Sequence, residues 1–246
     1  MKLSLCTLIL ALMVSNVFAQ RGNNYIKLSH NMTTETKAIT GFDKLDVSED
    51  FEVYIRFSDK EEKVVIEANE NLHNLIQVEN IGGTLKIYTK SYSTSYSSGR
   101  NDAEEKLVAY ITAKTLTEIK GDEDVVIKLE DKLSADNLTI DLDEDCTLEG
   151  HIDVKNLSVK LNEDSELDIE GRAQTMQIKA NEDCSINSFD FIVGDLAIDL
   201  CEESEVKLTV NGKINLKARE ESTFTYKGDG SFTSKRLSGD SEVVKR

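Results

Sequence analysis

The sequence predicts an all-β fold, a β-solenoid of stacked parallel strands with coils of about 19 residues. One block of residues returns five times, with starts at positions 138, 157, 176, 196 and 214. Within each block apolar and polar residues alternate, which is the period of two that strands show. The chain contains no proline, so every backbone N–H can join a hydrogen-bond ladder.

Each block predicts one coil of the solenoid. The first reads Leu138-x-Ile140-x-Leu142-x-Glu144-Asp145-Cys146-x-Leu148. Nineteen residues are too few for a strand, a helix and two loops, so we expect two or three short strands joined by tight turns. The acidic pair breaks the alternation and predicts one turn, and glycines indicate a second turn at Gly150, Gly171 and Gly212. The third residues should form one buried column, comprising Ile140, Val159, Ile178, Ile198 and Leu216.

Degraded copies of the block extend the pattern in both directions. They start at 45, 64 and 119 on one side, and a partial copy starts at 237 on the other. We therefore expect one solenoid over residues 41–246, with degenerate coils over 41–115 and regular coils over 116–246. A low-complexity polar insertion, 91–102, interrupts the degenerate coils and predicts either a hairpin tip or an adaptable contact surface.

The N-terminal residues 1–19 have the pattern of a secretory signal peptide. Lys2 is followed by an apolar stretch over residues 3–14 and by a small-residue cleavage site ending at Ala19. We expect an exported protein that is periplasmic, on the outer surface or extracellular. Residues 20–40 are polar and aperiodic, which predicts a tether, and no segment is long and apolar enough to span a membrane.

The net charge of the chain disfavours some classes of binding partner. The formal net charge is −17, and removal of the signal peptide with Lys2 makes it −18. A charge of this sign argues against nucleic acid and against anionic membrane surfaces as partners. It is also typical of a solenoid kept soluble despite long, flat strands.

Three cysteines remain after signal removal. Cys146 and Cys184 hold the same place in their blocks, where other blocks have serine. They lie two coils apart, roughly 9.6 Å at the spacing of neighbouring strands, beyond the about 7 Å that a disulfide can bridge. We therefore predict that Cys146 and Cys184 are free thiols in an inward ladder, and Cys201 holds a different place, so that no pair of cysteines is geometrically natural.

The acidic pairs are the sharpest candidate site. In register they form a column of carboxylates along one edge of the solenoid, which could hold Ca²⁺ or could remain a solvated ladder screened by salt. No block has the spacing of a calcium loop, which favours the solvated ladder. The candidate metal ligands are Asp145, Asp164, Asp183, Glu203 and Glu221.

No catalytic or cofactor-binding residues are predicted. The three histidines, His30, His73 and His151, share no spacing, and the chain has neither a phosphate loop nor zinc-ligand spacing. A second outward column mixes both charges and predicts a salt-bridged strand face, formed by Lys120, Asp141, Lys160, Lys179, Asp199 and Lys217.

The N-terminal half carries a resemblance to a known family. Its marks are Gly41-Phe42-x-x-Leu45-x-Val47, then Asn71-Leu72, and then Gly83-x-Leu85-x-Ile87. In these the sequence resembles the putative auto-transporter adhesin family, the head GIN domain, common in exported proteins of Bacteroidetes-type bacteria. The resemblance covers nearly all of residues 40–246 and implies a right-handed, single-stranded parallel β-helix of pectate-lyase-like architecture, with no catalytic residues to transfer. Two departures are the acidic pairs, where the family usually has small residues, and Lys114, near which proline is often found.

Two classes of function follow. The first is a non-catalytic exported module of the cell envelope or surface, an adhesin or a binding scaffold for a protein or a glycan. The alternative is a carbohydrate-active enzyme built on a β-helix. The sequence lacks the basic and histidine-bearing cleft that such an enzyme needs, so it favours the first class.

Overall fold

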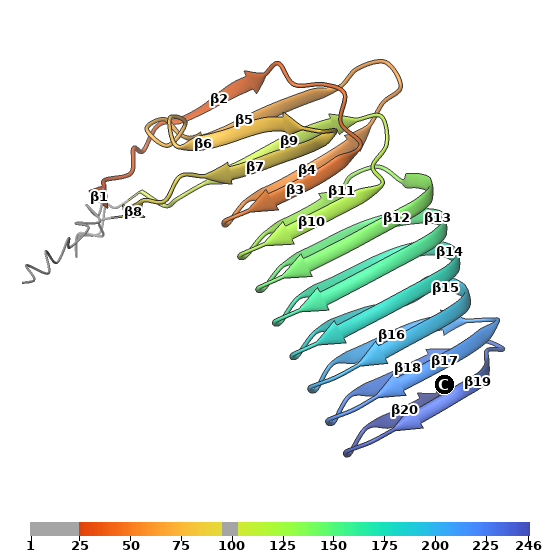
Figure 1. Ribbon diagram of the computed structural model, residues 1–246. Coiled ribbons are helices and arrows are strands. Elements are labelled where there is room, and N and C mark those ends of the chain that lie inside the picture. Colours follow the sequence, from red (N-terminus) through yellow and green to blue (C-terminus); the bar gives the residue numbers. More distant parts are fainter. Residues whose placement is uncertain (1–24, 95–102) are drawn as a thin grey trace, which may run out of the picture.

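The chain folds into an elongated parallel β-solenoid of about seven turns with a spacing of about 19 residues (Figure 1). The computed structural model describes residues 25–94 and 103–246, and within these ranges every regular element is a strand. The predicted fold class is therefore confirmed. The right hand of the coil, implied by the resemblance, stays a prediction. The predicted signal peptide and residues 95–102 of the insertion lie outside the described residues.

Eleven strands build the regular part of the solenoid, each paired in parallel with its equivalent in the next coil. They are β10 (Glu118–Asp122), β11 (Val126–Leu129), β12 (Leu133–Asp143), β13 (Thr147–Asn162), β14 (Glu166–Asn181), β15 (Ser185–Leu200), β16 (Glu205–Val210), β17 (Lys213–Ala218), β18 (Thr223–Lys227), β19 (Ser231–Leu237) and β20 (Glu242–Lys245).

The core is a set of apolar columns that run along the solenoid axis. Ile140 pairs with Val159, and Val159 with Ile178, so the third residues of the blocks stack in register. None of the five third residues is more than 4% exposed, which confirms the predicted column. In the last coil the register places Lys235 beside Leu216, so the column ends on a charged side chain.

The second turn expected at Gly171 is a bend within a continuous strand. Gly171 has a φ of 113° inside the continuous strand β14, where a Cβ atom would lie 2.3 Å from the carbonyl oxygen of Ile152. The chain therefore changes direction at this glycine without leaving the sheet. Two consecutive exposed residues, Gln174 and Thr175, mark the next corner of the same coil.

The N-terminal region corrects the expectation of degenerate parallel coils over 41–115. The strands β3 (Lys44–Ser48) and β4 (Glu52–Phe57) do pair in parallel with β10 and β11. In contrast, β5 (Lys63–Asn69) pairs antiparallel with β9 (Leu107–Ala113). A hairpin joins β6 (Ile76–Ile81) to β7 (Thr84–Thr89) through Gly82 and Gly83, both at positive φ, as a tight two-residue turn requires.

The tether predicted for residues 20–40 is wrong for residues 32–37. These form β2 (Met32–Lys37), an edge strand that pairs antiparallel with β5. All but one of its side chains are exposed, so backbone hydrogen bonds rather than burial hold it in place. Further upstream, β1 (Tyr25–Ile26) pairs with β8 (Ser93–Thr94). Within the described ranges, no helix has the length and apolar character needed to cross a membrane.

Candidate functional site

The acidic pairs form a stack of turns along one edge of the solenoid. Both residues of every pair have a positive φ, for example 48° at Glu163 and 60° at Asp164. The N–H of the second residue donates to the carbonyl of the first residue in the next coil, as Asp145 does to Glu163 at 2.8 Å. This ladder of hydrogen bonds stabilises a left-handed backbone that costs non-glycine residues roughly 1–2 kcal/mol each.

In the five regular blocks, a buried small residue, either Cys or Ser, follows each acidic pair on the inside of the turn. Ser204 Oγ donates to the carbonyl of Cys201 at 2.8 Å, and Cys184 Sγ makes the same contact with the carbonyl of Asn181 at 3.1 Å. Cys146, Cys184 and Cys201 are all buried with free thiols, as the coil geometry predicts. Burial raises the pKa of Cys146 and Cys184 to about 11, so these thiols stay protonated at neutral pH.

The candidate metal ligands are solvated side chains of this edge. All five are exposed, and four of them line an open groove of about 640 Å³, namely Asp164, Asp183, Glu203 and Glu221. Desolvation, followed by the charges of neighbouring carboxylates, raises the pKa of Glu163 above its ordinary value. The groove is therefore an acidic surface of mutually repelling carboxylates, and the solvated ladder that the sequence favours over a calcium site stays a prediction.

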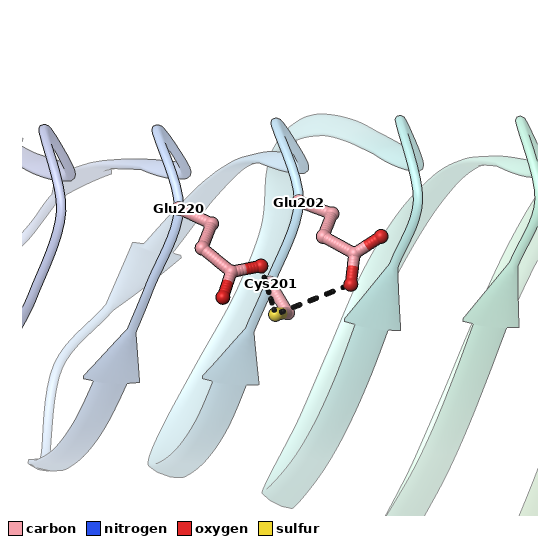
Figure 2. Close-up of side chains that lie close together, drawn as sticks. All are labelled: Cys201, Glu202 and Glu220. Atoms are coloured by element: carbon pink, nitrogen blue, oxygen red, sulfur yellow. Dashed lines mark hydrogen bonds between the residues drawn. The ribbon is translucent and has the colours of Figure 1, made fainter.

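One cluster at this edge was not predicted from the sequence. Cys201 Sγ lies 3.3 Å from Glu220 Oε2 and 3.9 Å from Glu202 Oε1 (Figure 2). Ligand atoms of all three residues lie within 4.8 Å of one another. Cys201 and Glu220 lie 19 residues apart, which is one coil, and this spacing could have predicted that their side chains are neighbours. Burial, followed by the hydrogen bond to Glu220, raises the pKa of the Cys201 thiol above its ordinary value, and the thiol donates a hydrogen bond to the Glu220 carboxylate.

The mixed charged column lies on the sheet face before the acidic turns. Lys160 pairs with Asp141 at 3.3 Å, and Lys217 pairs with Asp199 at 3.2 Å. In the first coils Lys86 continues the column and pairs with Asp46 at 2.6 Å. Two neighbouring pairs of the predicted column are therefore salt-bridged, as its mixture of charges predicts, whereas Lys179 takes part in no ion pair among the described residues.

The sequence of this chain matches a known family over most of its length. The family model for the putative auto-transporter adhesin, head GIN domain, matches residues 41–230. The chain belongs to the head GIN family. Among curated proteins, no match to the sequence is found.

Solved structures share the head GIN fold. A putative adhesin from Bacteroides fragilis superimposes with a TM-score of 0.74 at 22% identity, covering 89% of this chain and 97% of that chain. A putative adhesin from Parabacteroides merdae gives 0.66 at 17% identity, with coverages of 91% and 99%. A putative lipid binding protein from Parabacteroides distasonis gives 0.67 at 19% identity, with coverages of 91% and 100%. At these identities the likeness concerns the fold alone.

The histidines of this head GIN chain do not form a shared centre. His73 Nε2 lies 3.1 Å from the carbonyl of Thr33, and His151 Nδ1 lies 3.2 Å from a carboxylate oxygen of Glu170. In the described part of the chain, no hydrogen bond or ion pair joins His30, His73 or His151 to another histidine. Each has a local role, and the structure does not bring them together.

Proposed function

We propose that this chain is a non-catalytic, exported module of the cell surface that binds a protein or a glycan through the flat faces of its solenoid. Membership of the head GIN adhesin family supports this role. The predicted signal peptide supports export to the periplasm, the outer surface or the extracellular space.

The observation that carries the proposal is the repetition of outward side chains along the axis. Asp141, Lys160 and Lys179 occupy equivalent places in successive coils, each paired in register with the next. Neighbouring places lie about 4.8 Å apart on a hydrogen-bonded scaffold. Such a face presents its groups in a fixed line. An extended partner therefore binds without the entropy cost of ordering flexible protein segments. A long, preorganised face suits adhesion better than it suits turnover of a small substrate.

The test is binding and turnover measured on the same ligands. Purified residues 20–246 are applied to arrays of glycans and of surface proteins, with the heat-unfolded chain as the control. We expect saturable binding to at least one extended ligand and no release of new reducing ends from any glycan. Product release at a rate proportional to enzyme concentration would instead establish the carbohydrate-active alternative. Protease treatment of intact cells tests the surface location, because a surface protein is cleaved without lysis.

A further inference from the structure

A shallow trough of about 390 Å³ lies on the sheet face formed by β14, β15, β17 and β19. Two columns of outward residues line it over four consecutive coils. The first column is neutral and carries Gln177, Ala197, Asn215 and Ser234. The second is charged and carries Lys179, Asp199, Lys217 and Arg236. The short side chain of Ala197, in register between Gln177 and Asn215, leaves the hollow open.

The trough is basic although the chain as a whole is strongly acidic. Its single carboxylate, Asp199, is already paired with Lys217 at 3.2 Å and with Arg219 at 3.2 Å. Within residues 25–94 and 103–246, neither Lys179 nor Arg236 takes part in an ion pair. Two cations at opposite ends of the trough therefore lack an anionic partner among the described residues, and they are available to attract one from outside.

The chemistry of the lining favours a glycan over a protein. A stable protein interface needs large apolar or aromatic anchors that are desolvated at its centre. The exposed large apolar residues of the described chain are Met32, Ile81, Tyr110, Ile192, Leu237 and Val244, none of which lines the trough. Moreover, β15 and β17 are paired on both sides, so their backbones offer no edge for an added strand.

We propose that this trough binds an acidic glycan chain, with Lys179 and Arg236 contacting its carboxylate or sulfate groups and with Gln177, Asn215 and Ser234 hydrogen-bonding its hydroxyls. The inference rests on the proposed binding function and names the ligand class. The trough extends over three coil spacings, roughly 14 Å, so it accommodates a segment of polymer rather than one sugar. The glycan lies along the solenoid axis, parallel to the two columns.

The test compares two double variants of the full mature chain. Lys179→Gln with Arg236→Gln removes the unpaired cations of the trough. Lys155→Gln with Arg172→Gln removes the same two residue types from a different corner, where both are well exposed. The probes are oligogalacturonate, heparin fragments, a neutral oligosaccharide and poly-glutamate, titrated calorimetrically at about 0.15 M salt so that diffuse attraction is screened.

We expect the wild type and the corner variant to bind at least one acidic glycan equally, and the trough variant to bind it at least about tenfold more weakly. Equal melting temperatures show that both variants fold. Equal losses in the two variants, equal affinity for poly-glutamate, or no binding of any acidic glycan would overturn the inference. If the arrays reveal a neutral glycan or a protein ligand that the trough variant still binds, the inference fails while the proposed function stands. If the arrays and the titrations detect no ligand, both fail.

Discussion

The backbone N–H of Asp164 donates a hydrogen bond to the carbonyl oxygen of Glu182, one coil further along, with an N···O distance of 2.9 Å. Both residues have φ near 60°. The contact recurs from coil to coil, so each acidic turn is held by its neighbour rather than by its own sequence. The left-handed turn of Glu and Asp is therefore stabilised by the hydrogen bonds between stacked coils. The effects of its backbone strain and of its charge can be separated by substitution.

Replacing Glu182-Asp183 by Asn-Gly should stabilise the protein. Glycine and asparagine accept positive φ at less cost than the native pair, which saves roughly 1–2 kcal/mol per residue, whereas glycine loses about 0.5–1 kcal/mol through the entropy of the unfolded chain. The net effect should be a small rise in the melting temperature measured by circular dichroism. Glu182→Gln with Asp183→Gln serves as the control, because it removes the charges and gives neither position a residue that favours positive φ. A lower melting temperature for Asn-Gly than for this control would contradict the strain argument.

Replacing Ile178 by Asp should destabilise the protein by several kcal/mol, because an unpaired charge would enter the apolar column. Ile178 is 2% exposed, whereas Ile192 is 47% exposed and provides the matched control for the same substitution. The free energies of unfolding, obtained from urea titrations, should differ clearly between the two variants. Equal free energies would show that the stacking register described above is incorrect.

The acidic edge should respond to ionic strength and not to the identity of the cation. Screening relieves the repulsion between stacked carboxylates in any salt, so sodium and magnesium chloride at matched ionic strength should raise the melting temperature similarly. A calcium site would instead respond to sub-millimolar calcium by mass action. A calcium-specific rise that disappears in Asp164→Asn with Asp183→Asn would establish the metal site.

The two buried thiols in the turn positions should make stability depend on alkaline pH. The pKa of Cys146 and Cys184 is about 11 in the folded chain, against an ordinary value of 9.0. Above the ordinary value the unfolded thiols lose their protons first, so folding stability falls as the pH rises from about 9 to about 11. The Cys146→Ser, Cys184→Ser variant, which carries the residue found at this place in other coils, should lose less stability over this range. Urea midpoints measured at pH 8, 9 and 10 test this; parallel curves for the two proteins would refute it.

Alkylation gives an independent view of the same thiols. The native chain should react slowly with iodoacetamide at pH 8, because buried protonated thiols are poor nucleophiles. After unfolding without reductant, the mature chain should take up three labels by intact mass. A mass two units light with a single label would reveal a disulfide.

Much of the solenoid follows from the sequence alone. The fixed spacing of the blocks and the period of two together determine which residues point inward, so Ile140, Val159 and Ile178 could be assigned to one column. The turn at each acidic pair could be located for the same reason, because it interrupts the alternation. These features are local and repeated, and repetition turns a weak pattern into a strong one.

Only the tertiary structure determined which strands pair and which side chains form ion pairs, because the side-chain pattern does not encode these partners. The strand β2 is held by backbone hydrogen bonds to β5 and exposes nearly all of its side chains, so no hydrophobic period reveals it. The antiparallel pairing of β5 depends on which edge is free once β4 and β9 have paired. Likewise, Lys217 and Lys179 occupy equivalent places in the repeat, yet only the coil-to-coil geometry settles which of them shares Asp199. Pairing partners are chosen by the packed assembly, since each strand could satisfy its hydrogen bonds in several registers or directions.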